Sequence, residues 1–194
     1  MEWREIMKGK TKIKVIFLVH TSTIGGGERS LLDILTYIDK GKFHPILVCF
    51  EDGPLVKKAA EIYGVQIKVI PFSKKIITYN RDNKNLSQLF AIGLLGKPMM
   101  QLLIYMLKSK ARIIYSNSMK AHFIGLVLGK MTFKKVIWHV RDILGDGLNK
   151  KLFVRLSSFT DEIICISNAV SKQFKSRSNI KIIYNGIHPL EEDK

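Results

Sequence analysis

The sequence predicts an α/β domain in which a mainly parallel, seven-stranded sheet is covered by helices on both faces. Short apolar runs of strand length alternate with stretches of helical periodicity along nearly the whole chain. The apolar runs are near-continuous, which is typical of parallel strands that are buried on both faces. Repeated units of this kind build a Rossmann-like, three-layer α/β/α domain.

Each expected element follows from its own pattern. The strands are expected at 12–20, 45–50, 66–70, 112–115, 135–140, 162–166 and 181–184. Helical spacing is found at 27–40, 55–63, 86–108 with a break at Lys97-Pro98, 121–130, 148–158 and 169–174. In doubly wound sheets ligands bind outside the carboxyl ends of the strands, so the residues that follow each strand are the candidates for function.

Composition limits the classes of partner. The formal net charge of +16 favours anionic partners such as nucleotides, phosphorylated substrates or an anionic membrane surface. Nucleic acid is given little weight, because the lysines are spread along the chain and no nucleic-acid-binding module accompanies them. Cys49 and Cys165 lie in separate apolar runs and are expected to be core thiols in a reducing, cytoplasmic compartment.

No signal peptide is expected at the N-terminus, and the longest apolar stretch is a poor membrane span. Lys97-Pro98 and Gln101 interrupt the segment 89–107, which leaves two short apolar pieces. We expect a buried or interfacial helix pair there. A basic amphipathic face of this kind would also suit the surface of an anionic membrane.

A glycine turn follows the first strand and opens a helix. Gly25, Gly26 and Gly27 leave room for a ligand to approach the backbone, and a helix N-terminus offers free N–H groups to a phosphate or diphosphate. The alternative is a tight turn that requires positive φ and binds nothing. The turn is not a P-loop, because no Gly-Lys-Ser/Thr follows it.

The same turn partly matches a dinucleotide-binding fingerprint. Gly25 and Gly27 are followed by Ser30, where that pattern has Gly or Ala, and Glu51 could bind a ribose hydroxyl. An NAD(P)-binding domain of an oxidoreductase is therefore the alternative function.

Polar residues follow three later strands. Asn117 comes after the fourth strand and could hold a sugar hydroxyl, although helix capping by Asn117 or Ser118 explains it equally well. His139, Arg141 and Asp142 come at the end of the fifth strand, where His139 could donate to a hydroxyl and Arg141 could pair with phosphate or carboxylate. The alternative is a buried histidine bonded to backbone, beside a local Arg141–Asp142 ion pair. After the sixth strand, Ser167-Asn168 is expected mainly to cap a helix.

Four segments together resemble the N-terminal domain of a GT-B glycosyltransferase of the family 4 type. They share the order and spacing of that family and cover most of the chain between Lys12 and Ile187. They are the turn Gly25-Gly26-Gly27-Glu28-Arg29 with its helix, the strand end Trp138-His139-Val140-Arg141-Asp142, the segment Ile164-Cys165-Ile166-Ser167-Asn168, and Ile183-Tyr184-Asn185-Gly186-Ile187.

The resemblance implies a set of roles. It implies that the glycine turn approaches the diphosphate of a nucleotide-sugar donor, and that His139 lies by the transferred sugar and assists a retaining transfer. From their positions, Asn117, Arg141 and Asp142 are expected to contact the acceptor, a lipid-linked, polysaccharide or other glycan. No cofactor is implied, since the nucleotide-sugar is a substrate, and no metal site is expected because the sequence has no Asp/Glu cluster of the metal-binding kind.

The sequence departs from the family pattern in extent. Residues 1–187 correspond to the N-terminal Rossmann-like domain, and 188–194 correspond to the start of an interdomain linker. The family's C-terminal, donor-binding domain has no counterpart here, so we expect a missing domain or a partner chain to supply it. We expect the chain alone to be inactive, and the enzyme to work in the cytoplasm, at or near the inner face of a membrane.

Overall fold

The computed structural model describes residues 11–72, 96–174 and 179–186. Strands and helices alternate in these ranges, as the sequence predicts. The strands are β1 (Ile13–Val19), β2 (Phe43–Cys49), β3 (Gln66–Val69), β4 (Ile113–Ser116), β5 (Lys135–Val140), β6 (Glu162–Cys165) and β7 (Ile180–Ile182). The α-helices are α2 (Gly26–Tyr37), α3 (Pro54–Ala60), α6 (Lys97–Lys108), α7 (Met119–Met131), α8 (Leu148–Leu156) and α9 (Asn168–Ser171), with short 3-10 turns η2 (Ser157–Phe159) and η3 (Lys172–Phe174).

The strands form one sheet in the order β3-β2-β1-β4-β5-β6-β7, and every described pair is parallel. The expected seven-stranded, Rossmann-like α/β fold is thereby confirmed. From β1 the chain adds β2 and then β3 on one side, and it then returns to place β4 on the other side of β1. The switch point between β1 and β4 brings the ends of these two strands together, where such sheets bind ligands.

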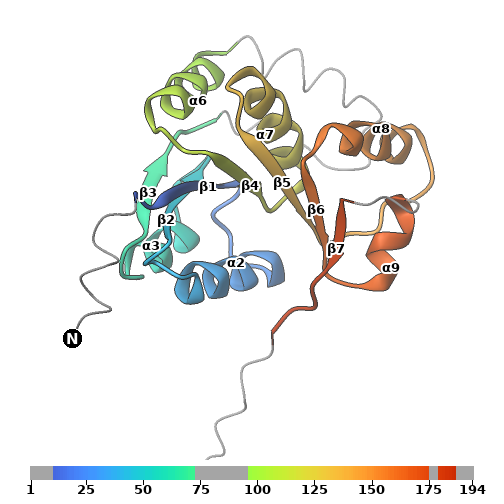
Figure 1. The fold of residues 1–194 in the computed structure, drawn as a ribbon, viewed down its shortest axis with the longest axis horizontal. Coiled ribbons are helices and arrows are strands. Elements are labelled where there is room, and N and C mark those ends of the chain that lie inside the picture. The colour runs from blue at the N-terminus through green and yellow to red at the C-terminus, as the bar shows by residue number, and fades with distance from the viewer. Residues whose placement is uncertain (1–10, 73–95, 175–178, 187–194) are drawn as a thin grey trace, which may run out of the picture.

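Helices cover both faces of the sheet. Figure 1 shows α2 and α3 on one face, and α6, α7 and α8 on the other. Alternate residues of β1 serve the two layers: Phe17 packs toward α2 and α3 with Leu31 and Leu35, whereas Leu18 packs in the cluster that holds Leu102 of α6. Burial on both faces explains why the strand sequences are apolar throughout.

Helix α7 approaches the sheet closely because of two glycines. A Cβ at Gly129 would overlap the side chain of Val136 in β5, and a Cβ at Gly125 would lie 3.2 Å from Cγ2 of Ile114 in β4. Neither glycine has positive φ. They are therefore required by the close approach of the helix, not by the conformation of the backbone.

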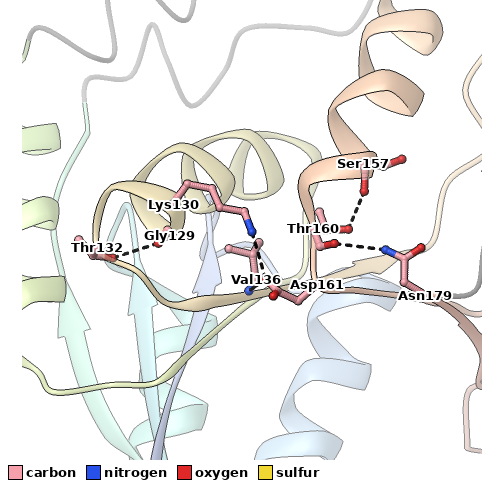
Figure 2. Close-up of polar contacts among 8 residues, drawn as sticks. All are labelled: Gly129, Lys130, Thr132, Val136, Ser157, Thr160, Asp161 and Asn179. Carbon is pink, nitrogen blue, oxygen red and sulfur yellow. Dashed lines mark hydrogen bonds and ion pairs between the residues drawn. The ribbon is translucent and has the colours of Figure 1, made fainter.

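A polar clasp ties the amino-terminal side of β5 to the chain before β6 and β7 (Figure 2). Asp161 accepts a 2.8 Å hydrogen bond from the backbone N–H of Val136, and Lys130 lies 3.4 Å from the same carboxylate oxygen. Asn179 donates to the carbonyl of Thr160 at 3.2 Å. These bonds satisfy polar groups at the edge of the sheet opposite to the candidate site, so we assign them a structural role.

The start of α6 at Lys97 agrees with the break predicted at Lys97-Pro98, because a proline lacks an N–H donor and is accepted in the first turn of a helix. Other boundaries differ from the sequence predictions. Strand β7 covers 180–182 instead of 181–184, and α9 gives way to a 3-10 turn after Ser171. The predicted loop at 73–85 and helix at 86–95 lie outside the described residues. No helix in the described ranges has both the length and the apolar character needed to cross a membrane.

Candidate functional site

The candidate residues meet at the carboxyl edge of the sheet. The glycine turn follows β1, Asn117 follows β4, and His139 and Arg141 stand at the end of β5. Hydrogen bonds among these residues connect segments that are far apart in the sequence. The sequence prediction that they share one edge is confirmed by these contacts.

The glycine turn has no left-handed residue. Gly25 is the N-cap of α2 with φ of −107°, and positive φ among the described glycines occurs only at Gly53, Gly64 and Gly147. The alternative in which the glycines serve only a positive-φ turn is therefore wrong. The N–H of Gly25 donates to Oε2 of Glu28 at 3.1 Å, which stabilises the start of the helix.

Asn117 holds the turn in place. Its side-chain amide donates to the carbonyl oxygen of Gly27 at 3.0 Å. Asn117 does not cap α7, and the N-cap residue Ser118 makes no capping bond either, because its hydroxyl lies 2.7 Å from Nδ1 of His20. Ser118 therefore occupies the N-cap position of α7, as one alternative predicts, but neither residue makes a side-chain capping bond.

Arg141 connects four segments at this edge. Its Nε donates to Oδ1 of Asn117 at 3.3 Å, Nη1 donates to Oδ1 of Asn185 at 3.0 Å, and Nη2 donates to the hydroxyl of Ser30 at 2.9 Å. Arg141 thus joins the end of β5 to α2, to the end of β4 and to the segment after β7. Sequence reasoning noted Ser30 and Asn185 as motif positions but did not pair them with Arg141, because their sequence separations from it are 111 and 44 residues.

Gly27 lies against this arginine. A Cβ at Gly27 would lie 3.4 Å from Cδ of Arg141 and 3.8 Å from Nδ2 of Asn117. Burial lowers the pKa of Arg141, whereas Tyr115 and the carboxylates of Glu28 and Asp142 oppose that shift. The guanidinium stays charged and gives the edge a fixed positive charge.

Asp142 acts on the cluster through its charge. Its carboxylate favours the charged form of Arg141 and so opposes the effect of burial on the pKa of the guanidinium. The backbone carbonyl of Asp142 accepts from Nε2 of Gln173 at 2.9 Å, which ties the chain after β5 to η3.

His139 is almost completely buried, with 5% of its surface exposed. Its Nδ1 lies 2.7 Å from the hydroxyl of Tyr115 and 3.2 Å from Nη2 of Arg141, while its buried Nε2 has no hydrogen-bond partner in the described structure. Burial, with the charge of Arg141, lowers the pKa of His139 to about 3, so the ring is neutral. The alternative of a histidine bonded to backbone is wrong, because its partners are side chains.

Glu51 bears on the dinucleotide alternative. Its Oε1 accepts hydrogen bonds of 2.8 Å from both the hydroxyl of Thr21 and the N–H of Ser22. This oxygen of the carboxylate therefore orders the loop after β1. A ribose would have to compete with these two bonds or use the other oxygen.

Ser167 caps α9 as predicted, since its hydroxyl accepts from the N–H of Val170 at 3.2 Å. Asn168 donates to the hydroxyl of Tyr184 at 3.1 Å. Among the described ranges, no three His, Cys, Asp or Glu residues are grouped so that they could hold a metal ion.

Comparison with known proteins identifies the family. The model of Glycosyltransferase Family 4 matches residues 24–189, which is most of the chain, and the chain belongs to this family. A search of the curated proteins finds no match.

Solved structures agree in fold. A structure of Alr3699/HepE from Anabaena in complex with UDP and glucose matches with a TM-score of 0.68 and 23% identity, over 90% of this chain and 45% of that one. A glycosyltransferase from Rickettsia africae matches with a TM-score of 0.67 and 17% identity, over 92% and 44%. MurG from Acinetobacter baumannii matches with a TM-score of 0.60 and 11% identity, over 92% and 47%. The chain therefore spans less than half the length of these proteins.

Proposed function

We propose that this chain is the acceptor-binding half of a retaining glycosyltransferase. The enzyme moves a sugar from a nucleotide-sugar to a lipid-linked, polysaccharide or other glycan acceptor. Family membership supports the reaction class. The UDP and glucose bound in the HepE complex support a nucleotide-sugar donor of the hexosyl type.

The open space at Gly26 carries the proposal. Gly26 has no positive φ, and a Cβ added there would have no heavy atom within 4 Å. Nothing in the described structure therefore requires a glycine at this position. An approaching ligand would require one, because the first-turn N–H groups of α2 have no intrahelical partner and carry a partial positive charge. The diphosphate of the donor suits these groups.

The remaining residues have roles on the same edge. His139 lies beside the transferred sugar, and its buried Nε2, which has no hydrogen-bond partner in the described structure, would meet a sugar hydroxyl once the atoms that cover it move. Asn117, Arg141 and Asp142 face the acceptor side. Because Asn117 and Arg141 are held by Gly27, Ser30 and Asn185, they would present a rigid surface to the acceptor.

The proposal requires a second domain or a partner chain to complete the cleft, so the chain alone should have little or no transferase activity. No resident cofactor is needed, because the nucleotide-sugar is a substrate. Charge on the departing diphosphate would be stabilised by the N-terminus of α2 and by basic residues.

Substitution of Gly26 tests the proposal. In the completed enzyme, Gly26→Ala should lower kcat/KM for the nucleotide-sugar at least about tenfold, since the methyl group would occupy the space of the diphosphate. The same change should leave the stability equal or up to about 1 kcal/mol higher, because alanine restricts the unfolded chain. Gly145→Ala is the matched control, since Gly145 also has open space around it. Full activity in Gly26→Ala would contradict the proposal.

A titration with NADPH addresses the alternative function. The transferase proposal predicts no change in nicotinamide fluorescence, because nothing in the proposed reaction uses that cofactor. Clear binding would instead support the oxidoreductase alternative, in which Gly25, Gly27 and Glu51 hold the dinucleotide.

A membrane role is proposed for α6. Met100, Ile104 and Leu107 are exposed and share one side of this helix, and Lys97 and Lys108 are exposed at its two ends. An apolar stripe with flanking lysines suits the inner face of an anionic membrane, where a cytoplasmic enzyme would meet a lipid-linked acceptor.

Vesicle sedimentation tests this role. The chain should sediment with phosphatidylglycerol vesicles at low salt and less at high salt. Ile104→Glu should reduce sedimentation, whereas Leu148→Glu, at an exposed position on α8, should not. Absence of binding at low salt would contradict the role.

A further inference from the structure

The side chains around His139 determine which of its ring nitrogens carries the proton. Nδ1 faces two groups, the Tyr115 hydroxyl at 2.7 Å and Nη2 of Arg141 at 3.2 Å. A guanidinium can only donate, because it has no acceptor atom. A hydrogen on Nδ1 could be accepted by the Tyr115 hydroxyl but would face the donor Nη2 of Arg141, whereas an unprotonated Nδ1 can accept from both groups.

The neutral form of the ring follows from burial and charge. Arg141 at the end of β5 repels a second positive charge, and Tyr115 on β4 is held neutral because burial raises the pKa of its hydroxyl. His122 on α7 is also neutral, since burial lowers its pKa to about 3. On the α2 side, the carboxylate of Glu28 favours the charged form of Arg141. A neutral imidazole with an unprotonated Nδ1 carries its single hydrogen on Nε2.

The proton on Nε2 has no partner in the described structure. The atom is buried, and a buried N–H without an acceptor costs about 1–3 kcal/mol. An acceptor oxygen from a ligand would remove this cost. Because Nε2 is covered here, the ligand reaches it only when the atoms that cover it move.

We propose that Arg141 and Tyr115 are positioning residues that hold His139 as the Nε2–H tautomer, so that its ring donates to an oxygen of the transferred sugar and cannot act as a base. This inference rests on the proposed function for the identity of the ligand. The tautomer itself depends only on the contacts within this chain.

Long-range ¹H–¹⁵N NMR of the chain, labelled with ¹⁵N-histidine, measures the tautomer directly. The His139 signals are assigned as those missing from His139→Gln. We expect a protonated Nε2, an unprotonated Nδ1 and no titration between about pH 5.5 and 8, where an unperturbed histidine would titrate. A proton on Nδ1, or titration in this range, would overturn the inference.

Two pairs of variants separate the effects of Arg141 and Tyr115 on the tautomer of His139. Arg141→Lys keeps a group that only donates and should keep the Nε2–H form, whereas Arg141→Gln supplies an acceptor and should allow a mixture of tautomers and a higher pKa of His139. Tyr115→Phe should shift the Nδ1 resonance, whereas Tyr105→Phe on α6 should not. An unchanged tautomer and pKa in Arg141→Gln would overturn the role of Arg141, and an unchanged Nδ1 resonance in Tyr115→Phe would overturn that of Tyr115.

The inference and the proposed function can fail separately. The expected tautomer in a protein that binds no nucleotide-sugar, even in a completed enzyme, would support the inference and contradict the function. An Nδ1–H tautomer in a protein with transferase activity would contradict the inference and support the function. Should Arg141→Gln not fold, the wild-type tautomer and Tyr115→Phe still decide the question.

Discussion

The side-chain amide of Asn117 donates a 3.0 Å hydrogen bond to the carbonyl oxygen of Gly27. This contact joins the end of β4 to the first turn of α2 across the switch point of the sheet. Arg141 bonds to Asn117 and Ser30, so the glycine turn is held from the side of β5 as well. The turn is thus fixed by side chains that come from later strands.

Asn117→Ala should loosen the glycine turn. The variant loses its bonds to Gly27 and Arg141, and we expect a loss of about 1–2 kcal/mol in the free energy of unfolding, measured with urea. Nucleotide-sugar binding in the completed enzyme should weaken as well. Asn149→Ala is a suitable control, because Asn149 lies on α8, outside this cluster. Unchanged stability and binding in Asn117→Ala would show that the bond does not order the turn.

Gly129→Ala should destabilise the fold. The added methyl group overlaps Val136, so α7 must move away from β5, at a cost of about 1–3 kcal/mol. Urea unfolding measures this cost against Gly145→Ala, which has open space. Equal stability of the two variants would contradict the close packing described for α7.

Asp161→Ala should weaken the clasp shown in Figure 2. The backbone N–H of Val136 loses its acceptor, and we expect a loss of about 1 kcal/mol. Asp146→Ala removes an ion pair with Lys150 in which the carboxylate side chain is almost fully exposed, and it should have little effect. The clasp assignment fails if both substitutions cost the same in thermal or urea unfolding.

The pH dependence of stability reports on the buried histidines. Burial lowers the pKa of His122 and His139 from 6.5 to about 3, so between these values the unfolded chain binds more protons than the folded one. Stability therefore rises with pH, and acidification from pH 7 to pH 5 should cost about 1–2 kcal/mol for each histidine. Urea unfolding at both pH values measures this loss.

Substitution separates the contribution of one histidine. Between pH 7 and pH 5, the stability of His139→Gln should fall less than that of the wild type. The stability of His44→Gln, at the second residue of β2, should fall as much as that of the wild type. If His139→Gln keeps the full pH dependence, His139 is not the neutral, buried group described here.

Most of the fold could be predicted from the sequence because the apolar runs are long and uninterrupted. The strand 12–20, for example, contains only buried or half-buried residues from Ile13 onward, and β1 occupies 13–19. Boundaries were less predictable. The break expected at Lys97-Pro98 coincides with the start of α6, but the strand expected at 181–184 occupies 180–182.

The sequence was sufficient to predict where the candidate site lies, but not which of its side chains form hydrogen bonds with one another. The switch-point rule places Gly26, Asn117 and His139 at one edge, and the structure places them there. The partners of Arg141 could not be predicted, because Ser30 and Asn185 lie far away in sequence and either could have capped a turn. The Tyr115–His139 contact was missed for a similar reason, since the apolar sequence around Tyr115 indicates only a buried strand.

The central claim is that the glycine turn and the end of β5 form one wall that binds the donor. Backbone ¹H–¹⁵N NMR of this chain, completed by its second domain or partner chain, during titration with millimolar UDP-glucose tests it most directly, with NADPH as the parallel titration. We predict chemical-shift changes at Gly26, Gly27 and Arg141, which are reduced in Gly26→Ala and absent with NADPH. Unchanged signals at these residues, or larger changes there with NADPH, would contradict the claim.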